Sequence, residues 1–221
     1  MIKRLLSFLL PIKVHEKKSV YNKNLEVTWN NGRLVLDSEN TNYSFGSLQR
    51  VLKKGLKYIG YERIKNFESI LVLGVAGGSV IATLKNEIQF EGKITGVEID
   101  PTVVDLANQY FGLKEYDNFE IVIDDDFEYV LKTKEKYDLI VIDIFQDTVM
   151  PNFLFEDFFI NRINFLLNIN GFILFNTMAL EYKDRRRNAI YKSKFDRNYS
   201  VRLYPKIEEH NELFTIKKLS S

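Results

Sequence analysis

Alternating hydrophobic and polar residues near the start of the chain predict a β-hairpin. In LEVTWNNGRLVLD, residues 25–37, apolar residues alternate with polar ones on both sides of Asn31-Gly32. This dipeptide readily adopts the positive φ angles of a two-residue turn, so we expect two antiparallel strands around it. Apolar residues then recur every three or four positions in residues 48–59, which predicts an amphipathic helix.

Five longer apolar runs follow, with helical segments between them. They are SILVLG (69–74), KITGVEI (93–99), FEIVID (119–124), YDLIVIDI (137–144) and GFILFNT (171–177). Because they are apolar on both faces, they fit a parallel sheet that helices cover on each side. Two last runs, 199–205 and 212–218, are too close together for a crossover helix and predict an antiparallel hairpin at the sheet edge. The pattern therefore predicts an α/β fold with a mostly parallel, seven-stranded sheet.

Composition excludes several classes of site but does not identify a binding partner. The 31 basic and 30 acidic residues nearly cancel, so no global field directs the protein to nucleic acid or to a membrane. The absence of cysteine excludes disulfides, thiol catalysis and zinc–thiolate sites, and favours a cytoplasmic location. The two histidines, His15 and His210, are far apart in the chain and lack the spacing of metal ligands. We expect no metal site.

The first residues, MIKRLLSFLLP, combine a basic start with a short apolar run. The run meets Pro11 instead of a small-residue cleavage site, so it predicts a short amphipathic helix lying on the domain and not a signal peptide. No stretch approaches the roughly 20 apolar residues that a membrane-spanning helix needs. We therefore expect no membrane partner.

The first apolar run leads into a glycine-rich turn, LVLGVAGGSV, residues 71–80. The turn departs from the dinucleotide pattern GxGxxG at Ala76 and Ser79, and by itself it fits close helix–strand packing equally well. Glu98 ends the next run, 24 residues after Gly74, near the interval of about 20 at which a carboxylate reaches ribose hydroxyls. The two features together predict a nucleotide-type site.

Further acids follow the third and fourth runs. Asp124, Asp125 and Asp126 are consecutive, and successive strand residues point to opposite faces, so they do not converge on one ion. One of them is expected to cap the helix 127–133, and one to face a ligand. Asp143 ends the fourth run, at the sheet edge where open α/β folds bind ligands.

The order and spacing of these segments resemble the spermidine synthase family, the aminopropyltransferase branch of the class I S-adenosylmethionine-dependent methyltransferase fold. The matching motifs are LVLGVAGGSV, ITGVEIDPTVVDLANQYFGL, IVIDDDFEYVL, YDLIVIDIFQD and NGFILFN. The resemblance implies a Rossmann-like S-adenosylmethionine-binding domain over residues 46–221, after a small helix-and-hairpin region over residues 1–45. It also implies a homodimer formed through the amino-terminal region.

The resemblance assigns roles to individual residues. Glu98 would bind both ribose hydroxyls, Asp125 would meet the adenine amino group, and Asp143 would border the substrate cleft. Asp100 and Pro101 form a good helix start, so we assign them a structural role. The full set expected to bind the cofactor is Gly74, Ala76, Gly77, Gly78, Glu98, Ile99, Asp125, Asp126 and Asp143.

The sequence also departs from the aminopropyltransferase pattern. Gly77 stands where the family carries an aspartate that faces the aminopropyl ammonium of decarboxylated S-adenosylmethionine. Gln146 stands where the family carries its catalytic aspartate, and an amide cannot act as a general base near neutral pH. The adjacent Asp147 is the candidate substitute for that base, and the stretch NYSFGSLQ lacks the tyrosine and acid of the polyamine gate.

These departures favour intact S-adenosylmethionine as the cofactor and methyl transfer to a small-molecule acceptor as the reaction. The catalytic candidates are Asp143, Gln146 and Asp147, and the acceptor-side candidates also include Tyr43, Phe45 and Phe145.

Three alternatives remain open. A diverged spermidine synthase would use decarboxylated S-adenosylmethionine and release methylthioadenosine, and a non-catalytic protein would only bind a nucleoside. The basic stretch 181–202 suggests nucleic-acid modification, but a solvated helix face explains it better, so we expect no nucleic-acid partner.

Overall fold

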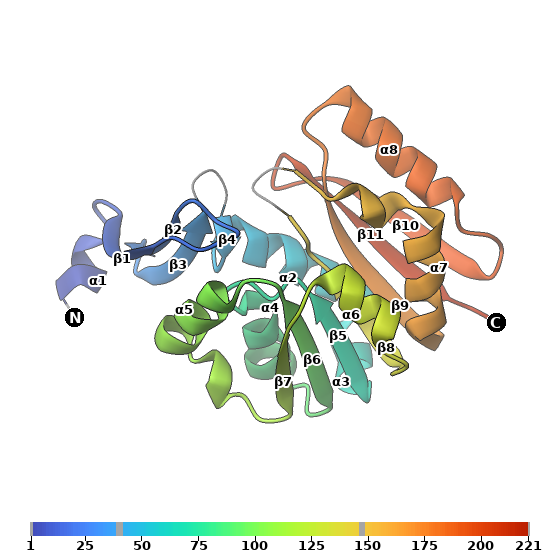
Figure 1. Ribbon diagram of the computed structural model, residues 1–221, viewed down its shortest axis with the longest axis horizontal. Helices are drawn as coiled ribbons and strands as arrows, with labels where there is room; N and C mark the ends of the chain where they lie inside the picture. The colour runs from blue at the N-terminus through green and yellow to red at the C-terminus, as the bar shows by residue number, and fades with distance from the viewer. Residues whose placement is uncertain (1, 39–41, 146–148, 221) are drawn as a thin grey trace.

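The computed structural model describes residues 2–38, 42–145 and 149–220. Its centre is a seven-stranded sheet with the order β10-β11-β9-β8-β5-β6-β7 (Figure 1). All pairs from β9 to β7 are parallel, whereas β11 is antiparallel to both β9 and β10. The strands are β5 (Ser69–Leu73), β6 (Lys93–Glu98), β7 (Phe119–Ile123), β8 (Tyr137–Ile142), β9 (Leu167–Met178), β10 (Tyr199–Ile207) and β11 (Asn211–Lys218). This confirms the α/β fold and the terminal hairpin.

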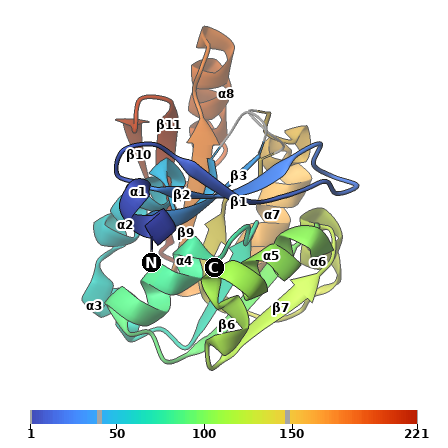
Figure 2. The same ribbon diagram turned by 90° about the vertical axis from the view of Figure 1, so that its left-hand side faces the viewer.

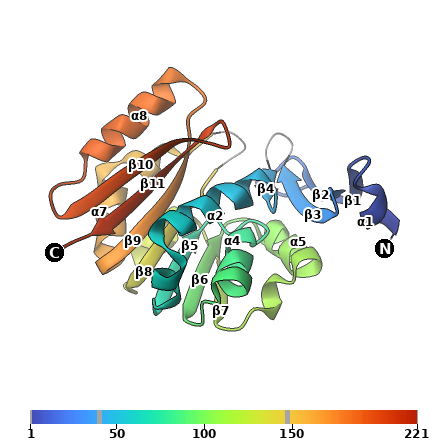
Figure 3. The same cartoon turned by 180° about the vertical axis from the view of Figure 1, so that it is seen from behind.

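Helices cover both faces of this sheet. The helix predicted over 48–59 is α2, and its residues Val51, Leu52, Leu56 and Ile59 are buried as the spacing predicts. In Figure 1 α6 and α7 lie in front of the sheet, and in Figure 3, from behind, α2 and α4 do. The helices are α2 (Ser47–Ile59), α3 (Tyr61–Lys65), α4 (Ser79–Ala82), η1 (Thr83–Ile88), α5 (Pro101–Phe111), η2 (Leu113–Glu115), α6 (Asp126–Lys132), η3 (Asn152–Phe155), α7 (Asp157–Leu166) and α8 (Tyr182–Ser193).

Two hydrophobic clusters pack against the main sheet, one on each face. The first joins α2 and α4 to residues such as Ile70 and Leu139, and the second joins α6 and α7 to residues such as Leu71 and Ile140. Alternate residues of the same strands thus supply opposite clusters, which explains why these runs are apolar throughout.

A second, four-stranded sheet precedes the main one. Its order is β1-β2-β3-β4, with β1 (Ile12–Lys17), β2 (Leu25–Asn30), β3 (Arg33–Ser38) and β4 (Asn42–Ser44). The predicted hairpin is β2–β3, and Asn31 and Gly32 have the expected positive φ angles of 48° and 75°. β1 and β4 flank it and have no comparable alternation in the sequence. Figure 2 shows these strands above α4 and α5.

The amino-terminal helix α1 (Ile2–Leu6) is short and turns its apolar side chains outward. Arg4 Nε donates to the carbonyl of Gly32, 3.1 Å away, which holds the segment on the β2–β3 turn. Ile2 and Leu5 are nevertheless 73% and 63% exposed. The predicted helix is present, but it lies on the domain through polar contacts and does not bury its apolar face. Within the described residues, every helix is too short or too polar to cross a membrane.

Candidate nucleoside site at the sheet edge

The sequence-predicted residues meet where the strand order reverses, between β5 and β8. Gly74 follows β5, Asp143 follows β8, and the Asp143 amide donates to the carbonyl of Leu73. A Cβ atom on Gly74 would lie only 2.3 Å from the carbonyl oxygen of Asp143, and Gly74 has a φ of +82°. Glycine is therefore required here, and the carboxyl edge at this crossover is the usual ligand position in open α/β sheets.

The turn after β5 directs most of its backbone N–H groups to acceptors within the protein. Gly74 and Val75 donate to the carbonyl of Val97, Gly78 donates to Val75, and Ala76 donates to the Glu98 carboxylate. Ala76 adopts a φ of +50°, which is unusual for a residue with a side chain. Between Gly74 and Ser79, the N–H of Gly77 alone has no acceptor among the described residues.

Gly77 is buried against the amino-terminal sheet. A Cβ atom at this position would lie 2.7 Å from the Cβ of Ser44 and 3.0 Å from its Oγ. The same hydroxyl accepts a hydrogen bond from the Ser79 amide, so Ser44 of β4 is fixed against the turn. The missing side chain at Gly77 thus has a packing reason in addition to any ligand.

Glu98 ends β6 with its carboxylate inside the site. Its Oε2 accepts from Ala76 N at 2.9 Å, its Oε1 accepts from Asp100 N at 3.1 Å, and only 6% of the residue is exposed. Burial raises the pKa of Glu98 above its usual value, although the backbone donors favour the ionised form. A carboxylate has about four lone-pair positions, so two donors leave room for ribose hydroxyls.

The two acids after β7 have different environments. Asp125 is the N-cap of α6, and its Oδ1 accepts from Phe127 N at 2.8 Å and Glu128 N at 3.3 Å. Asp126 begins the helix with a buried carboxyl group that accepts from Gly74 N at 3.2 Å. Burial, and then the negative charge of Glu98, raises the pKa of Asp126 well above its usual value. The predicted cap is confirmed, and ligand contact by either residue stays a prediction.

Asp143 is held by a residue that sequence reasoning missed. Asn176 of β9, fully buried, donates through Nδ2 to Asp143 Oδ1 at 2.9 Å and accepts from Asn211. Burial raises the pKa of Asp143 to about 7, while the Asn176 hydrogen bond lowers it. The sequence did contain a signal for this contact, an asparagine inside the otherwise apolar run GFILFNT. A buried side-chain amide needs hydrogen-bond partners, so its position indicates a polar neighbour.

Asp100 is a structural residue, and its role is wider than its position at a helix start suggests. Its Oδ1 caps α5 through Thr102 N, and its Oδ2 accepts from Ser19 Oγ and from Asn22 Nδ2. These two residues come from the β1–β2 connection. Asp100 therefore ties the amino-terminal sheet to the domain that carries the site.

Of the acceptor-side candidates, the structure describes the side chains of Phe45 and Phe145, which contact different neighbours. Phe45 has a φ of +64° and stacks on Phe111 of α5, with 4.6 Å between the ring centroids. Phe145 is partly buried against the cluster under α6 and α7. Gln146 and Asp147, like the side chain of Tyr43, lie outside the described residues.

Comparison with known proteins gives a family and two kinds of relative. Residues 48–217 match the model of the spermine/spermidine synthase domain. A polyamine aminopropyltransferase of Vibrio vulnificus is 30% identical over 139 residues, which are 62% of this chain and 46% of that protein. The chain thus matches less than half the length of this curated relative.

Two solved structures share the fold. Human methyltransferase-like protein 13 in complex with SAH superposes with a TM-score of 0.65 at 21% identity, covering 80% of this chain and 86% of that one. A spermidine synthase in complex with the transition state analogue AdoDATO gives a TM-score of 0.68 at 18% identity, covering 95% and 73%. The family match covers well over half of the chain, which therefore belongs to the spermine/spermidine synthase domain family.

Proposed function

We propose that this protein is an S-adenosylmethionine-dependent transferase whose reaction is methyl transfer to a small-molecule acceptor. Relatives in both classes share the fold, and a methyltransferase and a spermidine synthase were solved with SAH and AdoDATO respectively. The choice between the two reactions rests on the residues around the glycine turn.

The described residues fit an adenosyl cofactor. Glu98 presents a buried carboxylate with remaining acceptor capacity for ribose hydroxyls, and Asp125 Oδ2 accepts no hydrogen bond from the described residues. The free N–H of Gly77 suits the carboxylate of an amino-acid tail. When bound, S-adenosylmethionine would supply an electrophilic methyl group on a sulfonium, a cation that nearby Glu98 and Asp143 would stabilise.

One observation carries the preference for the intact cofactor: Ser44 occupies the space beside Gly77. The aminopropyltransferase pattern places an aspartate there, and even a Cβ atom would contact Ser44 at 2.7 Å. Without that aspartate, the amino-acid carboxylate of S-adenosylmethionine meets a backbone donor and no repelling charge. The site therefore favours the carboxylated tail over the decarboxylated one.

Asp143 is the candidate for holding the proton that the acceptor releases. Its pKa of about 7 matches what a general base needs at neutral pH, and Asn176 fixes its orientation. Methyl transfer can also proceed mainly through alignment of nucleophile and methyl group. Asp143 would then set the pH dependence without being indispensable.

Calorimetry with S-adenosylmethionine and its decarboxylated form tests the proposal. We expect the intact form to bind at least as tightly in the wild type. Gly77→Asp should shift the preference toward the decarboxylated form by about tenfold, or about 1.4 kcal/mol. Gly77→Asn imposes nearly the same clash with Ser44 without the charge and serves as the control.

Aminopropyl transfer is the competing reaction, favoured by the name of the Vibrio relative. A tenfold preference of the wild type for the decarboxylated form, together with formation of spermidine from putrescine, would replace the methyltransferase proposal with this one. If neither nucleoside bound saturably, both the methyltransferase and the aminopropyltransferase proposals would be ruled out.

We also propose a homodimer assembled through the amino-terminal region. Leu9 and Leu10 are 80% and 72% exposed, next to the exposed face of α1. Exposed apolar surface of this kind often marks an interface. Light scattering should give twice the monomer mass, and Leu9→Ser with Leu10→Ser should return the protein to a monomer. A monomeric wild type at micromolar concentration would contradict the proposal.

A further inference from the structure

A concave surface lies between α8 and η3. It encloses a cavity of about 250 Å³. We call it the α8 groove; its lining residues are Phe155, Lys183, Arg186, Arg187, Ile190, Tyr191 and Lys194. Four of these side chains are cationic, three are apolar or aromatic, and none is acidic.

The lining residues of α8 form one stripe along the helix. They recur every three or four positions, so each turn contributes one or two side chains to the same face. From Lys183 to Lys194 the stripe is about 16 Å long at 1.5 Å per residue. Arg185 and Lys192 belong to the same helix but do not line the groove. The chain therefore contains cations inside and outside the groove on one element.

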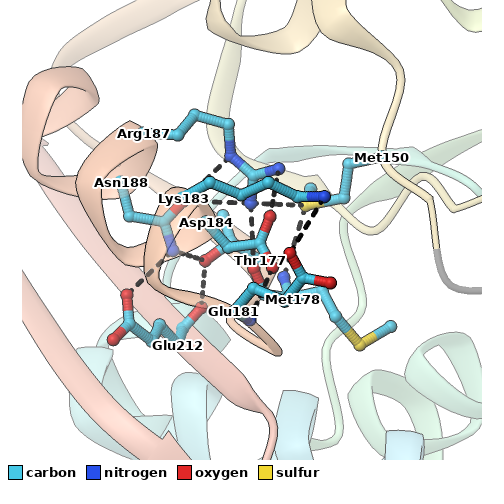
Figure 4. Close-up of polar contacts among 9 residues, drawn as sticks. All are labelled: Met150, Thr177, Met178, Glu181, Lys183, Asp184, Arg187, Asn188 and Glu212. Atoms are coloured by element: carbon cyan, nitrogen blue, oxygen red, sulfur yellow. Dashed lines mark hydrogen bonds and ion pairs between the residues drawn. The ribbon is translucent and has the colours of Figure 1, made fainter.

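Buried polar contacts hold this helix in place (Figure 4). Asn188 is fully buried and donates through Nδ2 to Thr177 Oγ1 at 2.9 Å and to Glu212 Oε2 at 2.8 Å. Arg187 donates to the carbonyl of Met178 at 2.8 Å, and its guanidinium lies 4.2 Å from the centre of the Phe155 ring. The groove wall is thus anchored to the main sheet and does not depend on a ligand for its position.

The cations at the two ends of the groove differ in how available they are to a ligand. Arg186 is exposed and has no acceptor or acidic partner among the described residues. Lys183 pairs with Glu181 at 3.1 Å, and both side chains are largely exposed, so this pair contributes little and is easily exchanged. Lys194 donates to the Phe155 carbonyl at 2.7 Å and pairs with Asp157 at 2.7 Å, and its own side chain is 25% exposed. An acidic ligand would have to exchange with Asp157, whose side chain is 77% exposed.

Between these cations, apart from the Arg187 guanidinium over the Phe155 ring, the groove is lined by apolar and aromatic side chains. Ile190 is 51% exposed and lies at the middle of the stripe, seven residues from Lys183 and four from Lys194. Tyr191 is only 3% exposed, and Arg187 covers the Phe155 ring. Aromatic faces on which nucleobases could stack are therefore scarce, which disfavours single-stranded nucleic acid as the occupant.

We propose that the α8 groove binds an acidic, extended segment of a partner protein, with an apolar side chain placed between acidic residues. The apolar side chain would pack on Ile190, and the acids would meet Lys183 and Arg186 at one end and Lys194 at the other. An extended peptide rises about 3.3 Å per residue, so about five residues span the groove. The charge pattern and the apolar centre together select this occupant over a uniform polyanion.

Fluorescence anisotropy with labelled peptides tests the proposal, and it requires neither cofactor nor catalysis. The probe is an eight-residue peptide with acidic residues on both sides of a central phenylalanine. Two companion peptides replace the phenylalanine by serine or the acids by lysine. We expect the first peptide to bind at least about tenfold more tightly than either companion.

Matched variants separate the groove from general electrostatics. The double variant Lys183→Glu with Arg186→Glu and the single variant Ile190→Ser should each weaken binding by about tenfold. Arg185→Glu with Lys192→Glu makes the same change of charge on the same helix outside the groove, and should change affinity by less than about threefold. Thermal melting and circular dichroism confirm that each variant folds.

Four results would overturn the proposal. Equal loss of binding in the two charge-reversed variants would mean non-specific attraction. If peptide affinity did not change in Ile190→Ser, or when the central phenylalanine is replaced by serine, the proposed apolar contact would be wrong. Tighter binding of a single-stranded oligonucleotide than of the peptide, lost in the Lys183→Glu, Arg186→Glu variant, would identify nucleic acid as the occupant. Absence of saturable peptide binding would likewise end the proposal.

Discussion

Charged side chains are placed in opposite ways in two regions of this molecule. At the carboxyl edge of the sheet, Glu98, Asp126 and Asp143 are each less than 10% exposed and form no ion pair within the described residues. Along α8 and at its end, by contrast, Lys183 and Lys194 each pair with an exposed acid. We call the first region the acid rim and compare it with the α8 groove.

The comparison shows which charged groups lower the stability of the folded protein. A buried carboxylate without a cation is desolvated, so its pKa rises, and here that is the direction for all three acids of the rim. Solvated surface pairs such as those of α8 contribute at most about 1 kcal/mol. Costly groups persist mainly where function uses them, which makes the rim the better candidate for catalysis and the groove the better candidate for docking.

The largest expected effect on stability is at Asp143. Its pKa rises from 3.8 to about 7 on folding, so between these values the unfolded chain is ionised while the folded protein keeps the proton. Stability from this group is complete below about pH 3.8 and is lost as pH rises to about 7. At about 1.4 kcal/mol per pKa unit, the full loss above pH 7 is on the order of 4 kcal/mol.

Asp143→Asn removes this titration and keeps the acceptor for Asn176 Nδ2. Urea unfolding from pH 4 to pH 8 should show the wild type losing stability relative to the variant, by about 1.4 kcal/mol per pH unit below pH 7. Glu98 and Asp126 titrate in both proteins and cancel in the difference. Parallel stability curves for the two proteins would show that Asp143 is ionised in the fold.

Glu98 is expected to contribute most to cofactor affinity. Two charge-assisted hydrogen bonds to ribose hydroxyls are worth about 1.5–3 kcal/mol each, so Glu98→Gln should weaken nucleoside binding by about 3 kcal/mol, on the order of 100-fold. Calorimetry with S-adenosylhomocysteine measures this. Glu120→Gln on the neighbouring strand β7 changes an exposed carboxylate and should have no effect. Equal affinities of the Glu98 and Glu120 variants would place the nucleoside elsewhere.

The acid rim was predictable from the sequence because it depends on chain direction alone. Gly74, Glu98 and Asp143 each lie at the carboxyl end of an apolar run, and parallel strands place their carboxyl ends at one edge. The hydrophobic pattern likewise predicts all seven strands of the main sheet. These features depend on local periodicity, which is visible in a single sequence.

Contacts between distant segments were not predictable in the same way. Ser44 reaches Gly77, Asn176 reaches Asp143, and Asn22 reaches Asp100 only through tertiary packing of elements far apart in the chain. No spacing rule connects such residues, because their proximity depends on how whole elements dock. The strands β1 and β4 were missed for a related reason: they pair with the hairpin without a strong alternation of their own.

Asp125 lies between the two regions in exposure and should show a smaller, divided effect. Its Oδ1 caps α6, whereas its Oδ2 is proposed to accept from the adenine amino group. Asp125→Ala should lower the free energy of unfolding by about 1 kcal/mol through loss of the cap. Asp125→Asn keeps a good cap and should leave stability nearly unchanged, while still weakening the binding of adenine nucleosides. Unchanged nucleoside affinity in both variants would mean that Asp125 only caps α6 and does not contact the nucleoside.

The smallest expected effect is at Arg186, and its neighbour Arg187 provides the matched comparison. Arg186 has no described partner, so Arg186→Ala should change the free energy of unfolding by less than about 0.5 kcal/mol. Arg187 donates to the Met178 carbonyl and stacks on Phe155, so Arg187→Ala should destabilise the protein by about 1 kcal/mol or more. Urea unfolding of the two variants measures this difference in stability. It distinguishes Arg186, a cation available to a ligand, from Arg187, a cation that holds the helix in place. Comparable destabilisation by both would mean that Arg186 is structural, and the α8 groove would lose its most available charge.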